Sequence, residues 1–282
     1  MRNIKNPPKV LYTEGNIDLL NTYSISIIGS RACSLEGINS AKKFARDLTD
    51  QGLTIISGMA VGIDTAAHIG TLEENGKTIA VLGCGFENIF PKENIKLFHE
   101  IIESGGLVIS EYPPETQPNS KKFLERNRIV SGLAIGVLVI EAAHRSGTSV
   151  TCKFAREQNK EIFCIPHSLE DIHGTGTNRL IKNGAHLVTS AKDIVDFFDF
   201  LNYKELEDEE KIFSIPIEIN EKYLDVYNVL IGPPLNVEQI CNKLNKSASD
   251  VNNALLMLEL DGIVVKTKYG YQVNLEKDML WK

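Results

Sequence analysis

The tripeptide Gly29-Ser30-Arg31 combines residue types that are suited to holding a phosphate group. Glycine lets a backbone approach a ligand closely, and the free N–H groups where a helix begins favour an anion. Arginine adds a planar guanidinium that binds phosphate oxygens in pairs. The tripeptide follows the β-branched run Ser24–Ile28 and precedes a helical pattern. This order predicts a phosphate-binding loop between the first strand of an open sheet and its helix.

Residues of similar chemistry stand directly after later strand-like runs. They are Ser57-Gly58, Gly83-Cys84-Gly85, Glu141 and Arg145-Ser146-Gly147-Thr148. In a parallel sheet the carboxyl ends of the strands lie along one edge, where ligands bind. One glycine-rich loop would be weak support, but several at the same edge predict a single site.

Two basic residues are candidate phosphate ligands, and each has an ordinary alternative. Arg31 could instead be a surface arginine that caps a carbonyl, but its place in the first loop favours phosphate. Lys92 follows Pro91 in the loop after the third strand and points toward the same edge. Taken alone, Lys92 is typical of a solvated lysine.

Two further groups are expected to contribute to this site. Arg126-Asn127-Arg128 lies on a helix before the fifth strand, and either arginine could instead form an internal ion pair with Glu111 or Glu141. Ser146-Gly147-Thr148 offers hydroxyls and backbone N–H groups at a helix start, where a plain N-cap is the alternative. Arg145, directly before it, is another candidate phosphate ligand.

The acidic and metal-binding residue types do not indicate catalysis. We expect Asp64 and Glu141 to orient the basic residues. The histidines have no metal-ligand spacing, and no nucleophile–base pair stands out. We therefore expect no catalytic residue, no metal and no cofactor.

Short apolar runs alternate with helical patterns from residue 24 to residue 200. This alternation predicts an α/β fold with a doubly wound, mostly parallel sheet. Residues 1–22 read as a turn-rich lead-in. The expected strands are Ser24–Ile28, Leu53–Ile56, Thr78–Leu82, Leu107–Ser110, Gly136–Ile140, Glu161–Ile165 and Ala185–Val188.

A second, smaller domain is expected after a charged linker. We place the first domain at residues 1–202, an acidic linker at 203–213 and the second domain at 214–282. The second domain has three helical patterns, followed by two β-rich runs around Tyr269-Gly270. That order is typical of a winged helix-turn-helix, whose third helix would be the recognition helix. Its few basic groups predict weak duplex binding, so a protein partner is an equal alternative.

Composition limits the class of protein. The chain has 282 residues, of which 43% are hydrophobic, and a net charge of −7, so any nucleic-acid site must be a local concentration of basic residues. The five scattered cysteines fit a reducing compartment. The N-terminus has no apolar signal region, and the longest apolar stretch, around residues 133–143, is too short to span a membrane. We expect a soluble, cytoplasmic protein.

On the basis of these residues, the sequence resembles the DNA-processing protein A family (DprA, also called Smf) over about residues 7–200. The matching segments are Ile28-Gly29-Ser30-Arg31, Ser57–Asp64 with Ala67-His68, Thr78–Gly85, Phe90-Pro91-Lys92, Ser110–Pro113, Arg126–Ile129, Glu141, Ser146-Gly147-Thr148, and Asn178–Ile181 with Gly184-Ala185. One departure is His167, where the family usually has a glycine after proline, in a loop that could need positive φ.

The resemblance implies an extended Rossmann-like fold that binds single-stranded DNA without catalysis. It also implies homodimers that protect incoming DNA and load the RecA recombinase during natural transformation. The residues expected to bind nucleic acid are Gly29, Ser30, Arg31, Gly58, Lys92, Asn127, Arg128, Arg145, Ser146, Gly147 and Thr148.

Enzymes with related sheets are the alternatives to this interpretation. A dinucleotide-dependent enzyme is disfavoured because the first loop lacks G-x-G-x-x-G and the second strand ends in Ser57, where a ribose-binding carboxylate is expected. The remaining enzyme alternative is a nucleotide hydrolase of the lysine-decarboxylase-like (LOG) group. Glu141 ahead of Ser146-Gly147-Thr148 matches that group's loop only in part. A transcription factor acting through the second domain is a third alternative.

Overall fold

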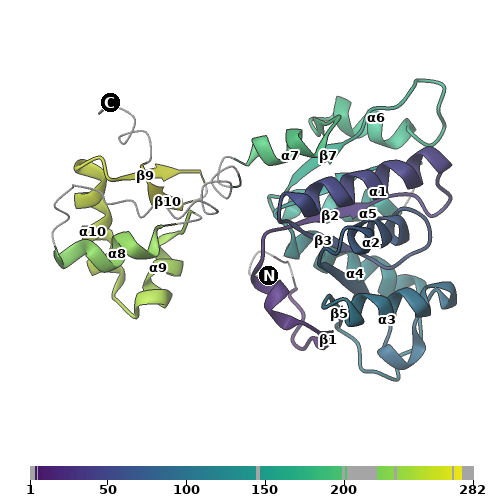
Figure 1. The fold of residues 1–282 in the computed structure, drawn as a ribbon, viewed down its shortest axis with the longest axis horizontal. Coiled ribbons are helices and arrows are strands. Elements are labelled where there is room, and N and C mark those ends of the chain that lie inside the picture. The colour runs from purple at the N-terminus through teal and green to yellow at the C-terminus, as the bar shows by residue number, and fades with distance from the viewer. Residues whose placement is uncertain are drawn as a thin grey trace. The chain divides into compact units, whose positions relative to one another are not determined.

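A computed structural model describes residues 4, 6–143, 147–198, 201, 221–231, 234–268 and 270–274 (Figure 1). The chain divides into two compact units, Met1–Ile194 and Val195–Lys282. The first unit therefore ends eight residues before the boundary that the sequence predicts at residue 202. The acidic linker expected at 203–213 lies outside the described residues. Within the described part of the chain, no helix has the length and apolar character needed to cross a membrane.

The first unit is built around a sheet with eight strands among the described residues, in the order β1-β5-β4-β3-β2-β6-β7-β8. Their bounds are β1 (Tyr12–Gly15), β2 (Ser24–Ile28), β3 (Thr54–Ser57), β4 (Thr78–Leu82), β5 (Leu107–Ser110), β6 (Gly136–Val139), β7 (Glu161–Cys164) and β8 (His186–Leu187). Neighbouring strands pair in parallel from β5 to β8, and only β1 pairs antiparallel, with β5. The predicted mostly parallel α/β sheet is therefore confirmed.

Helices follow the strands in the order that the apolar patterns predict. They are α1 (Leu35–Asp50), α2 (Ile63–Glu73), α3 (Ile95–Glu103), α4 (Ser120–Leu133), α5 (Gly147–Glu157), α6 (Thr175–Lys182) and α7 (Ala191–Phe197). Short 3₁₀ turns occupy Ile17–Asn21, Phe86–Asn88 and Lys92–Asn94. In Figure 1 the helices surround the strands of this unit, α1 beside α2 and α4 beside α5.

Alternate residues of one strand show that both faces of the sheet are covered. Successive side chains of a strand point to opposite faces. In β4, Ile79 and Val81 pack into the cluster that includes Ile129 of α4 and Cys152 of α5. Ala80 and Leu82 pack into a second cluster with residues of α3. The sheet is thus enclosed on both sides, which leaves the ends of its strands as the place for a ligand.

Strand β1 is the element that the sequence did not predict. Residues 1–22 were expected to form a lead-in without a strand, but Tyr12–Gly15 pairs with the edge strand β5. Three of its four residues are exposed, so the segment has no apolar alternation to reveal it. β1 pairs with β5 through backbone N–H and C=O groups at the edge of the sheet. Amino-acid composition does not predict such backbone pairing.

The second unit contains α8 (Leu224–Val229), α9 (Val237–Leu244), α10 (Ala248–Leu260) and the antiparallel strands β9 (Val264–Thr267) and β10 (Gly270–Val273). Asn236 caps α9, in a capping box with Gln239, and Ser247 caps α10. The helices and the hairpin share one apolar core. The order of elements is the one expected, and the winged helix-turn-helix interpretation stays a prediction.

A buried histidine in α2 makes the stability of the first unit depend on pH. His68 Nδ1 lies 2.7 Å from the Thr78 hydroxyl oxygen, which itself donates to the carbonyl of Ile55, so Nδ1–H donates to Thr78. The other ring nitrogen is buried without a hydrogen-bond partner. Burial, aided by the positive charge of Arg126, lowers the pKa of His68 to about 3.

We predict that acid destabilises this unit through His68. The unfolded chain takes up the proton near the ordinary histidine pKa of about 6.5, whereas the folded chain does so only near pH 3. The free energy of unfolding should therefore fall by about 1.4 kcal/mol per pH unit below pH 6. Urea denaturation at several pH values checks this slope. The substitution His68→Leu should reduce this pH slope. The control His99→Gln, at an exposed histidine, should leave it unchanged. Equal slopes in the two variants would contradict the role of His68.

Candidate nucleic-acid interface

A pocket of about 540 Å³ lies at the carboxyl ends of β2 and β3. The strand order reverses here, since β2 pairs with β3 on one side and with β6 on the other. Such a reversal opens a crevice between loops that leave in opposite directions. The pocket is lined by Ile28, Gly29, Ser30, Arg31, Ala32, Gly58, Ala60, Asp64, Phe90, Ser120, Phe123, Leu124, Arg126, Asn127, Val130, Gly147, Thr148 and Thr151.

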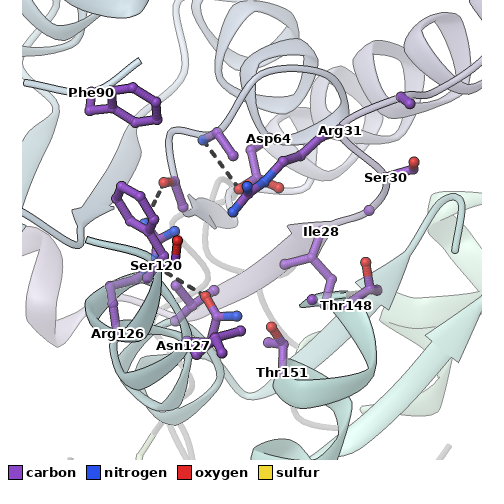
Figure 2. Close-up of a pocket in the computed structure, with 18 residues that line it drawn as sticks. Ile28, Ser30, Arg31, Asp64, Phe90, Ser120, Arg126, Asn127, Thr148 and Thr151 are labelled. Atoms are coloured by element: carbon purple, nitrogen blue, oxygen red, sulfur yellow. Dashed lines mark hydrogen bonds between the residues drawn. The ribbon is translucent and has the colours of Figure 1, made fainter. Parts of the chain in front are cut away.

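The innermost charged group of the pocket is the guanidinium of Arg126, in the middle of α4. The residue is only 4% exposed. Its Nη1 donates hydrogen bonds to the carbonyls of Gly58, after β3, and Val81, in β4. Its Nε donates to Oδ1 of Asn127 over 3.2 Å. Arg126 therefore joins α4 to two strand ends and fixes the side chain beside it (Figure 2).

A buried carboxylate compensates this cation. Asp64, in the first turn of α2, accepts a hydrogen bond from the backbone N–H of Ala60. Burial raises the pKa of Asp64, and the positive charges of Arg126 and Arg31 oppose that rise. Burial lowers the pKa of Arg126, and Asp64 opposes that change in turn. The two groups lie close enough to stabilise each other's charged forms. That Asp64 also orients the basic residues stays a prediction.

The rim of the pocket is cationic and aromatic. Arg31 is exposed, and its Cζ lies 5.9 Å from the centre of the Phe123 ring. Phe90 stacks on Phe123, with ring centres 5.5 Å apart and planes inclined by 25°. Phe90 remains 46% exposed. Figure 2 shows Phe90 and Arg31 on the same side of the space that Ile28 and Asn127 border.

Small residues bring the backbone of two loops to the pocket. A Cβ at Gly29 would lie 2.5 Å from Ile63 Cγ1, so glycine lets the first loop pack on the start of α2. Helix α5 begins at Gly147, and Thr148 and Thr151 of its first turns line the pocket. The free N–H groups at the start of a helix favour an anion.

Most of the residues that the sequence nominated are brought together here. Seven of them line the pocket, namely Gly29, Ser30, Arg31, Gly58, Asn127, Gly147 and Thr148. Lys92 does not line it and is exposed at the start of a 3₁₀ turn, two residues after Phe90. Arg145 and Ser146 lie outside the described residues.

Arg128 is the nominated residue that lies apart. Its Nη1 and Nη2 donate to the two carboxylate oxygens of Glu111, over 2.8 and 2.6 Å, and its Nε donates to the carbonyl of Asn6. The side chains of this ion pair are only 13% and 15% exposed. The internal pairing kept open as an alternative is what the structure shows, and we no longer include Arg128 among the phosphate ligands.

Two other expectations are corrected by the contacts. Glu141 is fully buried, and it contacts no basic lining residue of the pocket that the structure describes: it accepts hydrogen bonds from the backbone N–H and the hydroxyl of Ser34, the N-cap of α1. His167 does not adopt positive φ. Its ring nitrogens instead lie 3.0 Å from Asp171 Oδ2 and 2.8 Å from the Ile140 carbonyl.

Sequence reasoning missed the aromatic pair. Phe90 stands only within a segment that matches the family, and the sequence pattern does not single out Phe123. A signal did exist, since Phe90 precedes Pro91-Lys92 in a loop after a strand, where an apolar ring has no core to enter. Among the described residues, no group of three or more His, Cys, Asp or Glu side chains is placed to hold a metal ion.

Comparison with known proteins identifies the family. Residues 1–199 match the family described as DNA recombination-mediator protein A. The chain belongs to this family. It is 45% identical to the DNA processing protein DprA of Streptococcus pneumoniae over 197 residues, which cover 70% of this chain and 69% of that protein. It is 36% identical to the protein Smf of Escherichia coli over 267 residues, 94% of this chain and 71% of that one.

Solved structures of DNA recombination-mediator protein A relatives share the fold of the first unit. The crystal structure of DprA from S. pneumoniae matches with a TM-score of 0.66 and 44% identity, over 69% of this chain and 68% of that one. DprA from Helicobacter pylori, described for its single-stranded DNA binding mode, matches with a TM-score of 0.63 and 32% identity, over 73% of this chain and 91% of that one. The Rossmann-like fold inferred from the sequence is therefore confirmed.

We predict that Gly58→Ala destabilises the pocket. The added Cβ would lie 2.7 Å from both Arg126 Nη2 and Asp64 Oδ2, and the buried Arg126 is held by two carbonyls. The expected loss is about 1–3 kcal/mol of unfolding free energy, as for other overpacked sites. Urea denaturation measures it. Gly147→Ala is the matched control, because a Cβ there meets nothing within 4 Å; equal losses in the two variants would contradict the packing argument.

Proposed function

We propose that this chain binds single-stranded DNA at the pocket at the carboxyl ends of β2 and β3 and performs no reaction there. The observation that carries the proposal is the composition of the rim. Exposed Arg31 and the backbone of Gly29-Ser30 suit a phosphate, and the stacked pair Phe90–Phe123 suits a base. Proteins that hold single strands combine such cationic and aromatic groups.

The aromatic rim favours a single strand over a duplex. Bases in a duplex are already stacked on their neighbours, whereas an unpaired base can stack on an exposed ring such as Phe90. A pocket of about 540 Å³ also has room for a nucleotide. Relatives support the same conclusion, since the H. pylori protein of similar fold is described by its single-stranded DNA binding mode.

The position of the Glu141 carboxylate disfavours the nucleotide hydrolase alternative. In that alternative a carboxylate from this loop would stand beside the ribose of the nucleotide. Here the carboxylate of Glu141 is fully buried and hydrogen-bonded to Ser34, and it does not line the pocket. Binding without catalysis is therefore the better interpretation of the site.

Two finer elements of the proposal rest on the family. We propose that the chain forms homodimers, and that it protects incoming DNA and delivers it to the RecA recombinase during natural transformation. Membership of the DNA recombination-mediator family supports both. Light scattering tests the dimer, and RecA assembly on oligonucleotides coated with this protein tests the delivery.

We predict that Arg31→Ala and Lys92→Ala each weaken binding of a single-stranded oligonucleotide and flatten its salt dependence. In a plot of the logarithm of affinity against the logarithm of salt concentration, each neutralised phosphate contributes about −0.7 to the slope. Each variant should therefore have a slope less steep by about 0.7. Fluorescence anisotropy across a salt titration, with single-stranded and duplex oligonucleotides, measures both effects.

Lys43→Ala is the control for lost charge, because Lys43 is an exposed lysine on α1 that pairs with Asp47. It should leave affinity and slope unchanged. If Arg31→Ala and Lys92→Ala both bind like the parent, the site has been assigned to the wrong edge of the sheet.

A further inference from the structure

The amide of Asn127 has only one chemically acceptable orientation. Its Oδ1 lies 3.2 Å from Nε of Arg126, and a guanidinium carries N–H donors and no acceptor. The group that faces Arg126 must therefore be the carbonyl oxygen, since the reverse orientation would place two donors against each other. Arg126 cannot turn away, because Nη1 is bound to the carbonyls of Gly58 and Val81.

This orientation leaves the amide nitrogen of Asn127 for a ligand. Nδ2 makes no hydrogen bond to any residue that the structure describes, and the side chain is half-buried in the lining of the pocket. Figure 2 shows the nitrogen on the side of the amide away from Arg126, toward the space bordered by Ile28 and Thr151. At this point the pocket therefore offers a fixed hydrogen-bond donor.

The inner wall offers few acceptors to compete with it. Asp64 is the single carboxylate among the described lining residues, and its Oδ2 already accepts from Ala60. The hydroxyls of Thr148 and Thr151 can donate or accept. A ligand that presents an acceptor is thus matched on this side, whereas an amino group would meet the N–H groups of Asn127.

The difference in exposure between Arg31 and Arg126 indicates which part of a nucleotide reaches Asn127. Arg31 is exposed at the rim, and Arg126, beside Asn127, is 4% exposed at the inner end. A nucleotide with its phosphate at Arg31 directs its base inward. In a pyrimidine the group on C4 lies opposite the glycosidic bond and so reaches deepest. That group is a carbonyl acceptor in uracil and thymine and an amino donor in cytosine.

We propose that Asn127 is a specificity-determining residue that makes the pocket prefer a pyrimidine with a carbonyl at C4 over one with an amino group at C4. This inference rests on the proposed binding of single-stranded DNA. Arg126 is the positioning residue, because it holds the amide with its donor inward. Binding stays general along the strand, and the preference applies to the one base that enters the pocket.

Oligo(dU) and oligo(dC) of equal length are the sharpest probes, because both lack the methyl group of thymine and differ at N3 and C4 of the ring. Anisotropy at pH 8 and fixed salt should give the parent chain about a 2- to 10-fold higher affinity for oligo(dU), the range that one hydrogen bond provides. Asn127→Ala should bring the ratio of the two affinities close to 1. Asn127→Asp keeps the size and shape and replaces the donor by an acceptor, so it should shift the ratio toward oligo(dC).

Asn183→Ala is the matched control, since Asn183 is an exposed asparagine at the end of α6 that does not line the pocket, and it should keep the parent ratio. Equal affinity of the parent for both oligonucleotides, or a parent-like ratio in both Asn127 variants, would overturn this inference and leave the proposed function standing. Failure of the parent to bind either oligonucleotide would overturn the proposed function itself. If Asn127→Ala does not fold, the isosteric Asn127→Asp decides.

Discussion

The site depends on one buried interaction, the binding of the Arg126 guanidinium by the carbonyls of Gly58 and Val81. A buried cation is costly unless its hydrogen bonds are satisfied and an opposite charge lies near. Here two carbonyls and the carboxylate of Asp64 meet that requirement. The same contacts hold α4 against the ends of β3 and β4, so the wall that carries Phe123 and Asn127 has a fixed position relative to the first loop.

This arrangement separates two arginines that build the fold from Arg31, which is exposed to a ligand. Arg126 and Arg128 are neighbours in the sequence, yet both are used inside the first unit, one under the pocket and one on Glu111. Arg31 is exposed at the rim beside an aromatic ring. A chain of net charge −7 can therefore present a local anion site, because the carboxylates near it are buried against donors.

The sequence predicted the sheet well because its strands are buried apolar runs, and three expected ranges, Ser24–Ile28, Thr78–Leu82 and Leu107–Ser110, agree with the structure residue for residue. It also placed the loops at one edge. It could not decide between Arg126 and Arg128, because residues on a helix are separated by 100° each and either could face inward. Strand β1 and the burial of Glu141 depend on pairings between distant segments, which a single sequence does not reveal.

Photocrosslinking tests the central claim most directly, because it reports which side chains touch a base. A single-stranded oligonucleotide carrying 5-iodouracil would be irradiated with the full chain, and the crosslinked residue identified by mass spectrometry. The account predicts attachment at Phe90 or Phe123, the stacked pair at the rim of the pocket. Attachment confined to the second unit, for example at Tyr271, would contradict it.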